Sequence, residues 1–265
     1  MEQGVYLGLD GRAALVTGAG SGVGRAIAFW LARAGCDVAI VDLSRDAAER
    51  VADELRELDY TAIAVAADLR SERGVEAMVA KVVAKFDSLD VAVNLPAPPA
   101  GRPGRAGAHD GERSSDLARA VTASCCRAEA AAMSATGEGG ALVNVAWGWS
   151  EEGPRAAETT HGIDDLTRTL AVDLGPSGVR VNAILAIIST GADARRAVAP
   201  ERARAGALER AVPAEDIGRV AVFLASNLSR KVSGQILRVE ADVLPGEAAV
   251  VSRTARRGPP GPKRG

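Results

Sequence analysis

The stretch Thr17-Gly18-Ala19-Gly20-Ser21-Gly22-Val23-Gly24 decides the fold, because it joins a short apolar run to an amphipathic one. Residues 13–17 are predicted to form a strand and residues 23–34 a helix. Glycines let the main chain approach a ligand closely, and the free N–H groups at a helix start attract anions. The spacing Gly-x-x-x-Gly-x-Gly therefore predicts a phosphate cradle between the first strand and the first helix. The alternative is a strand–turn–helix with a purely structural role.

An acidic residue stands where a nucleotide-binding fold needs one. Asp42 ends the second predicted strand, about 20 residues after the turn, where a carboxylate binds an adenosine ribose. A carboxylate repels a 2′-phosphate, and neither Ser21 nor Leu43 brings a positive charge in its place. Arg45, a positive residue nearby, weakens this argument against a 2′-phosphate. We therefore expect NAD(H) to be favoured over NADP(H).

Apolar runs and amphipathic stretches alternate along the rest of the chain. Strands are predicted at 13–17, 38–42, 62–66, 91–95, 141–145, 179–185 and 235–239, and helices at 23–34, 46–58, 72–86, 115–134, 163–174 and 214–224. Near-continuous apolar strands indicate a sheet that is covered on both faces. The prediction is a single-domain α/β protein, a Rossmann-like doubly wound parallel sheet of about seven strands with helices on both faces.

Three stretches interrupt this alternation. Residues 96–112 are rich in proline and glycine and are predicted to form a loop. Residues 186–209 follow the sixth strand, where a mobile lid is expected. Residues 252–265 are basic and rich in proline and glycine, so the folded domain is expected over 1–251 and a disordered tail over 252–265.

Composition excludes several classes of protein. The chain has 265 residues, of which 47% are hydrophobic and 25% charged, with a net charge of −2, so neither disorder nor a nucleic-acid partner is indicated. No apolar run reaches the roughly 18 residues that span a membrane, and the first residues do not resemble a secretion signal. Three cysteines and two histidines fit no disulfide framework or metal site. The expectation is a cytoplasmic protein without a metal.

These motifs together resemble the short-chain dehydrogenase/reductase family, from Arg12 to about Asp242. The resemblance is carried by the glycine turn, by Asp68-Leu69, by residues 89–94, and by the later segments 140–145, 166–182, 213–224 and 232–239. It implies the fold predicted above and a nicotinamide cofactor. The cofactor-contacting positions that it implies are Gly18, Ser21, Gly22, Val23, Gly24, Asp42, Leu43, Asp68, Leu69 and Asn94.

The resemblance fails at the family's Asn-Ser-Tyr-Lys tetrad. Alignment from the flanking segments places Thr122, Trp147, Ala156 and Thr160 at these four positions. In the family, the lysine lowers the pKa of the tyrosine, which exchanges the substrate proton, and none of the four replacements can do this. Carbonyl reduction is therefore predicted to be absent or very slow, and the cofactor to be structural or vestigial. The motif after Asn94 also departs from the family, as does Ala186-Ile187, where the family has Pro-Gly.

Few residues offer replacement chemistry. Trp147 and Trp149, expected on the loop that carries the family's serine, are interpreted either as an aromatic wall that holds a substrate or as a plug of an empty pocket. His161 is a weak candidate for a general base, because one helical step turns it about 100° from Thr160. Cys125 and Cys126 are interpreted as buried structural cysteines.

Three functional hypotheses remain open. The first is a non-redox enzyme that catalyses cyclisation, isomerisation or elimination on a hydrophobic small molecule, in a bacterial biosynthetic pathway. The alternative is a non-catalytic pseudoenzyme subunit that pairs with an active paralogue of the same family. The third is an atypical NAD-dependent oxidoreductase. The resemblance also implies a homo- or hetero-oligomer formed through the helices near 115–134 and 157–174.

Overall fold

The structure is a computed structural model that describes residues 6–95, 108–149, 161–188 and 213–239. Its centre is a parallel sheet of seven strands in the order β3-β2-β1-β4-β5-β6-β7. The strands are β1 (Ala13–Thr17), β2 (Asp37–Asp42), β3 (Ala62–Ala66), β4 (Val91–Asn94), β5 (Gly140–Trp149), β6 (Val179–Ile188) and β7 (Ile236–Val239). The predicted Rossmann-like α/β class is confirmed.

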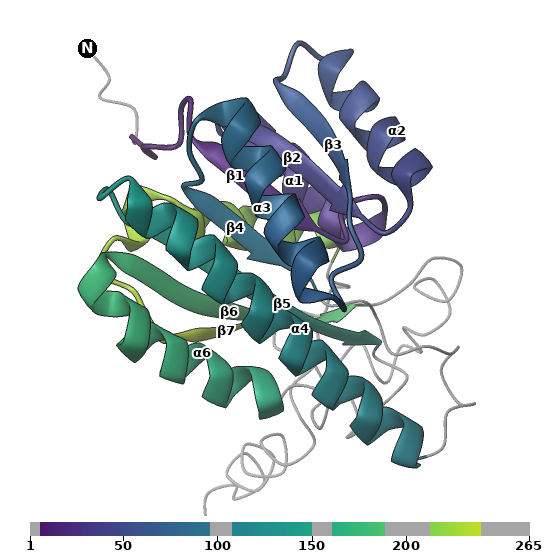
Figure 1. Ribbon diagram of the computed structural model, residues 1–265, viewed down its shortest axis with the longest axis vertical. Helices are drawn as coiled ribbons and strands as arrows, with labels where there is room; N and C mark the ends of the chain where they lie inside the picture. The colour runs from purple at the N-terminus through teal and green to yellow at the C-terminus, as the bar shows by residue number, and fades with distance from the viewer. Residues whose placement is uncertain (1–5, 96–107, 150–160, 189–212, 240–265) are drawn as a thin grey trace, which may run out of the picture.

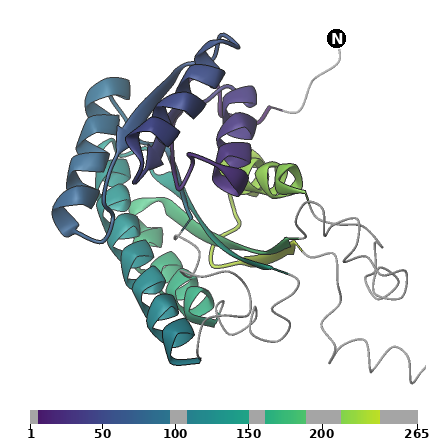
Figure 2. The same ribbon diagram turned by 90° about the vertical axis from the view of Figure 1, so that its right-hand side faces the viewer.

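Helices cover both faces of the sheet, as the two views in Figures 1 and 2 show. The helices α3, α4 and α6 lie on one face, and α1, α2 and α8 lie on the other. The helices are α1 (Gly22–Arg33), α2 (Arg45–Arg56), α3 (Glu72–Phe86), α4 (Ala108–Ala135), α6 (His161–Leu174) and α8 (Ala214–Ala225), with short 3₁₀ turns η2 (Gly175–Ser177) and η3 (Asn227–Ser229). None of the described helices is long and apolar enough to cross a membrane.

The strands are apolar along their whole length because each side of the sheet has its own core. All five residues of β1 are buried. Val16 and Ile40 face the layer of α1, α2 and α8, whereas their neighbours Leu15 and Val41 face the layer of α3 and α4. This alternation is the period of two that a strand imposes on its side chains.

The strand order places a crevice at one edge of the sheet. From β1 the chain proceeds outward to β2 and β3 and then returns to β4, which pairs with the other side of β1. In open parallel sheets, ligands bind outside the carboxyl ends of the strands at this reversal. The glycine turn after β1 and the end of β4 therefore meet at the expected site.

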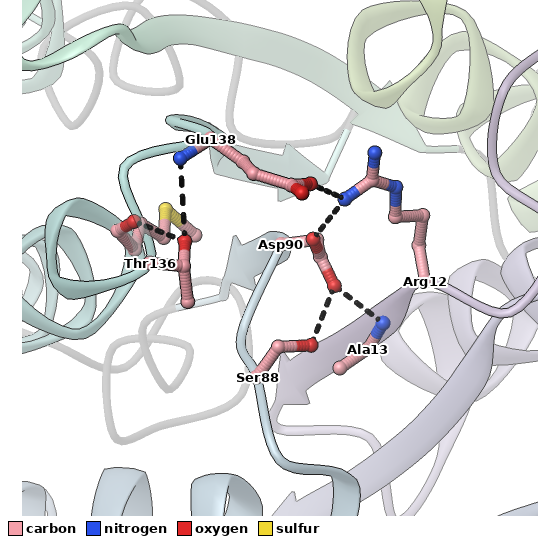
Figure 3. Close-up of polar contacts among 7 residues, drawn as sticks. Arg12, Ala13, Ser88, Asp90, Thr136 and Glu138 are labelled. Atoms are coloured by element: carbon pink, nitrogen blue, oxygen red, sulfur yellow. Dashed lines mark hydrogen bonds and ion pairs between the residues drawn. The ribbon is translucent and has the colours of Figure 1, made fainter.

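At the amino ends of the strands, opposite the crevice, a polar cluster holds the sheet together (Figure 3). Asp90, just before β4, accepts hydrogen bonds from Arg12 Nη1 at 2.7 Å, Ala13 N at 2.8 Å and Ser88 Oγ at 2.9 Å. Arg12 Nη1 also contacts Glu138 Oε2 at 2.6 Å, just before β5. The cluster joins the amino ends of β1, β4 and β5, at the far end of the strands from the crevice.

Three boundary predictions are wrong. The helix α4 begins at Ala108, so His109 and Asp110 belong to a helix rather than to the predicted loop. β5 continues to Trp149 and β6 to Ile188, with the two strands paired over their full length. Ala186 and Ile187 continue this ladder because, unlike the Pro-Gly of the family, they keep a backbone donor and favour extended backbone. The remainder of the expected lid, residues 189–209, and the expected tail, residues 252–265, lie outside the described part of the chain.

Candidate functional site

The glycine turn has the close packing that its sequence predicts. Gly18 and Gly22 adopt φ values of +63° and +55°, which side-chain-bearing residues rarely adopt. A Cβ on Gly24 would lie 2.2 Å from Gly18 O, so only glycine allows α1 to start this close to β1. A Cβ on Gly22 would meet nothing within 4 Å, so the space in front of this residue is open among the described atoms.

The start of α1 leaves donors available for an anion. Ser21 stands at the N-cap, but its side chain forms no capping hydrogen bond, and the first turn holds no acidic residue. Val23 is buried and fixes this turn against the core. Unpaired N–H groups and the positive end of the helix dipole then face the open space before Gly22. These features fit a pyrophosphate group.

Asp42 lies beside this turn and is held by the main chain. Its Oδ2 accepts from Gly20 N and its Oδ1 from Ser44 N, each at 3.0 Å. Each carboxylate oxygen keeps room for another donor, as two ribose hydroxyls would require. Leu43, next to it, exposes 67% of its surface at the same edge.

Arg50 is a positive residue at this site that the sequence did not reveal. From α2, its Nη2 donates to Gly20 O at 3.0 Å, so it braces the glycine turn from outside. Arg45, named from the sequence, begins α2 and is exposed. A helical residue eight positions beyond Asp42 gives no sequence signal of this contact, because the contact depends on how α2 folds back on the turn.

Asp68 follows β3 and is already paired. Arg70 donates to it through Nε at 2.8 Å and Nη2 at 2.7 Å, and Arg70 N adds a third hydrogen bond at 3.1 Å. The Arg70 side chain, with this backbone donor, lowers the pKa of Asp68 to about 2. Leu69 packs partly buried against the core. The structure places Asp68 and Leu69 just after β3, and the sequence gave no sign of the Arg70 pair.

Asn94 is buried, and its side chain turns away from the crevice. Its Nδ2 donates to Glu129 Oε2 of α4 at 2.7 Å and lies 3.6 Å from Cys126 Sγ. The next residue, Leu95, donates its N–H to Thr17 Oγ1 at 2.9 Å, which links the end of β4 to the end of β1. Asn94 is thus linked to the glycine turn through its neighbour Leu95, while its own side-chain amide bonds to Glu129 in the core.

A buried polar chain continues from Asn94 toward α6. Cys126 Sγ donates to Asn144 Oδ1 at 3.2 Å, and Asn144 Nδ2 donates to Thr167 Oγ1 at 3.4 Å. Cys125 and Cys126 are buried as expected, and burial raises the pKa of both thiols. Sequence reasoning missed Glu129, although it lies seven residues, or about two helical turns, after Thr122 and therefore on the same face of α4.

The tetrad positions are only partly within the described chain. Thr122 is buried in α4 and donates its hydroxyl to Ala118 O at 2.9 Å. Trp147 and Trp149 lie in β5, paired with Ala186 and Ile188 of β6, rather than on the predicted loop. His161 is the first residue of α6. Ala156 and Thr160 fall outside the described residues. Among the described residues, no cluster of ligands is suited to a metal ion.

Known proteins are similar to this chain in sequence. The profile of a family described as enoyl-(acyl carrier protein) reductase matches residues 18–241. The chain is 31% identical to the 7alpha-hydroxysteroid dehydrogenase of Escherichia coli over 245 residues, which cover 88% of this chain and 94% of that enzyme. It is 34% identical to the cis-4-hydroxycyclohexanecarboxylate dehydrogenase of Sinomonas cyclohexanicum over 249 residues, 86% of this chain and 95% of that enzyme.

A solved structure confirms the likeness in three dimensions. The 7 alpha-hydroxysteroid dehydrogenase complexed with NADH and 7-oxo glycochenodeoxycholic acid superimposes with a TM-score of 0.74 at 30% identity, covering 89% of this chain and 96% of that one. The sequence profile, the identity over nearly the full length and the shared fold agree. The chain belongs to the short-chain dehydrogenase/reductase family.

Proposed function

We propose that this protein binds NAD(H) in the crevice between β1 and β4 and converts a hydrophobic cyclic small molecule without the family's tyrosine–lysine proton transfer. The observation that carries the binding is Asp42, fixed by Gly20 N and Ser44 N beside an open glycine turn. The structure of a relative with NADH supports it.

The residues that would hold the dinucleotide are distributed along the carboxyl edge. The first turn of α1 would hold the pyrophosphate, Asp42 the ribose hydroxyls, and Leu43, Asp68 and Leu69 the adenine end. Bound NAD(H) would supply or accept a hydride only if the protein is an oxidoreductase, the second candidate below. The carboxylate of Asp42 disfavours a 2′-phosphate, so we propose NAD(H) over NADP(H).

The residues at the tetrad positions favour a reaction other than carbonyl reduction. Reduction of a carbonyl needs a positioned acid for the developing alkoxide, and such help contributes about 10²- to 10⁴-fold to the rate. The Thr122 hydroxyl is already used on Ala118 O, and an alanine at 156 cannot carry a proton. We infer that carbonyl reduction is absent or very slow and that the cofactor has a structural or vestigial role.

A non-redox conversion, such as cyclisation, isomerisation or elimination, fits these residues best. Trp147 and Trp149 stand at the end of β5, and large aromatic groups there suit a flat or hydrophobic ligand. Two relatives are named for alcohols on ring systems, a hydroxysteroid and a hydroxycyclohexanecarboxylate. These names support a cyclic hydrophobic substrate, and a biosynthetic role is part of the proposal.

A second candidate is an atypical NAD-dependent oxidoreductase. It is favoured by the named relatives, which are dehydrogenases. In this case the substrate proton would pass through a group outside the four tetrad positions.

A pseudoenzyme subunit is the further alternative. Leu117 on α4 and Val172 on α6 expose 51% and 75% of their surfaces, which favours a subunit interface with a second copy or with an active paralogue. Co-purification with a paralogue that carries the tyrosine and lysine would support this alternative.

Titration with NADH, followed by fluorescence, tests the binding. We expect Asp42→Ala to weaken NADH binding at least tenfold and Asp46→Ala, at an exposed acid of α2, to leave it unchanged. Failure of the wild-type protein to bind at millimolar NADH would contradict the proposal.

Turnover assays test the reaction. A screen of cyclic ketones and alcohols with NAD(H) should show no turnover typical of the family, and typical turnover would favour the oxidoreductase. Trp147→Ala should abolish a non-redox conversion, but it should leave the activity of an associated paralogue nearly unchanged.

A further inference from the structure

Glu129 is the most unusual buried group of the described chain. It is 0% exposed between α4 and the sheet. Its Oε2 accepts from Asn94 Nδ2 at 2.7 Å. Its Oε1, as well as Asn94 Oδ1, is buried without a hydrogen-bond partner among the described residues. A carboxylate in such a position is poorly compensated, whereas a protonated carboxyl group can donate to an acceptor.

Within the described part of the chain, the surroundings of Glu129 offer no counter-charge. β4 and β5 contain no charged residue, and Asn94 and Asn144 are their polar residues near Glu129. The charged residues of α3 are exposed, as are the described charged residues of α6 except the half-buried Asp164. The other described charged residues of α4 are also exposed, and Arg180 of β6 donates to carbonyl groups at the end of α8. The remaining titratable neighbours are the thiols of Cys125 and Cys126, which Glu129 influences.

Burial without a counter-charge favours the neutral form. It raises the pKa of Glu129 to about 7, although the Asn94 hydrogen bond acts in the opposite direction. The carboxyl group therefore changes charge within the range of physiological pH.

Glu129 is linked to the glycine turn through two residues, Asn94 and Leu95. Asn94, its partner, is followed by Leu95, whose N–H donates to Thr17 Oγ1 at 2.9 Å. Leu95 also packs beneath Gly18, where an added Cβ would lie 3.4 Å from Leu95 O and 3.5 Å from Leu95 Cβ. The end of β4 is thus held by Glu129 on one side and supports the glycine turn on the other.

We propose that Glu129 is a positioning residue for the nucleotide cradle, which acts through Asn94 and Leu95, and that its neutral form is the one that orders the end of β4 and the glycine turn. Ionisation places a buried negative charge against a single amide donor, so the end of β4 loosens. Nucleotide affinity then falls as the proton is released. This inference rests on the proposed NAD(H) binding for its effect on the ligand, while the ordering of the turn is independent of any ligand.

The experiment compares wild type, Glu129→Gln and Glu76→Gln, the last at an exposed acid of α3, at pH 6 and pH 8. Hydrogen–deuterium exchange is measured on peptides that contain residues 13–24 and 88–95, after correction for the intrinsic pH dependence of exchange. We expect exchange in wild type and Glu76→Gln to be at least threefold faster at pH 8, and exchange in Glu129→Gln to be the same at both pH values. Equal pH dependence in wild type and Glu129→Gln would overturn the proposal.

Two further measurements separate the possible failures. The Kd for NADH should rise at least threefold from pH 6 to pH 8 in wild type and stay constant in Glu129→Gln. If wild type binds no NADH at either pH, the proposed function fails, while the exchange data still decide whether Glu129 positions the turn. If Glu129→Gln does not fold, carbon NMR of wild type labelled at glutamate carboxyl groups replaces it. A buried glutamate signal that titrates near pH 7 together with the exchange of residues 88–95 supports the proposal, and the lack of such a signal overturns it.

Discussion

The two ends of β4 are both held by a carboxyl group, and they are held in opposite ways. At the amino end, Asp90 receives a guanidinium, a backbone amide and a hydroxyl. At the carboxyl end, Glu129 receives a single amide from Asn94, and one of its oxygens has no partner among the described residues. The first arrangement suits a permanent charge. The second suits a group that is neutral for part of the pH range.

The amino and carboxyl ends of the strands therefore differ in how completely their polar groups are hydrogen-bonded. The amino edge lies away from the crevice and has its polar groups satisfied (Figure 3). The carboxyl edge keeps two buried polar atoms, Asn94 Oδ1 and Glu129 Oε1, without a hydrogen-bond partner among the described residues. Native proteins commonly accept such local costs at functional sites.

The largest expected effect concerns the stability contributed by Glu129. Its pKa is raised in the folded state from 4.5 to about 7, so its contribution is fully present below about pH 4 and is lost as the pH rises through 7. Between pH 4 and pH 8 the free energy of unfolding of wild type should fall by up to about 3 kcal/mol relative to that of Glu129→Gln. Urea unfolding of both proteins across this range measures the difference. A constant difference would show that the pKa of Glu129 is the same in the folded and unfolded states.

The next largest effect on stability is expected at the amino end of β4. Asp90→Asn replaces one acceptor oxygen with a donor, which then faces another donor in Arg12, Ala13 or Ser88. We expect a loss of about 2 kcal/mol of unfolding free energy at pH 7. Glu138→Gln, at the 63% exposed partner of Arg12, is the control and should cost less than about 1 kcal/mol. An equal loss in the two variants would mean that Asp90 acts only as a surface charge.

A smaller effect is expected for the combination of the two ends. Asp90 and Asn94 are separated by four residues of extended chain, roughly 13 Å at 3.3 Å per residue. The unfolding free energies of Asp90→Asn and Glu129→Gln at pH 8 should therefore add to within about 0.5 kcal/mol in the double variant. A larger deviation in the double-mutant cycle would show that β4 transmits strain between its ends.

The smallest effect on stability is expected for a third carboxyl group, Asp68, which is paired at the surface. Arg70→Ala should leave the urea midpoint unchanged, since exposed ion pairs contribute little. The pKa of Asp68, about 2 in the wild type, should rise toward its ordinary value of 3.8. Carboxyl NMR of the two proteins between pH 1.5 and pH 5 measures this shift. An unchanged pKa would assign the lowering to the backbone N–H of Arg70 alone.

The fold could be predicted from sequence because its signals are local. Buried strands such as β1 read as apolar runs, and the glycine turn marks the first crossover. Their predicted centres are confirmed, and 13–17, 62–66 and 72–86 agree to the residue. The sequence did not predict the extension of β5 and β6, because it depends on pairing between the two strands. The β-propensity of a residue says nothing about the strand with which it pairs.

The residues of the candidate site could be predicted only where both the residue type and its spacing from the glycine turn indicate a role. Asp42 stands at a fixed distance from the glycine turn, so its place was evident. Glu129 was not evident, because a single acid on a long helix is normally at the surface, and its burial follows from the packing of α4 over β4 and β5. Asn94 was assigned to the cofactor, yet its amide faces α4 for the same reason.

The long β5–β6 pair has a consequence for any attempt to introduce the family's tetrad at the predicted positions. Among the described strands, β5 beyond Asn144 pairs only with β6, so the paired ends of β5 and β6 form a ribbon that extends past β4 and that β7 accompanies up to Ala186. Exchanging Trp147 for serine would place a hydroxyl within this ribbon instead of on a free loop. An engineer would first have to terminate the ribbon, for example with proline and glycine at 186 and 187, before grafting a proton donor. Point substitutions at the predicted tetrad positions alone would leave this strand pairing in place.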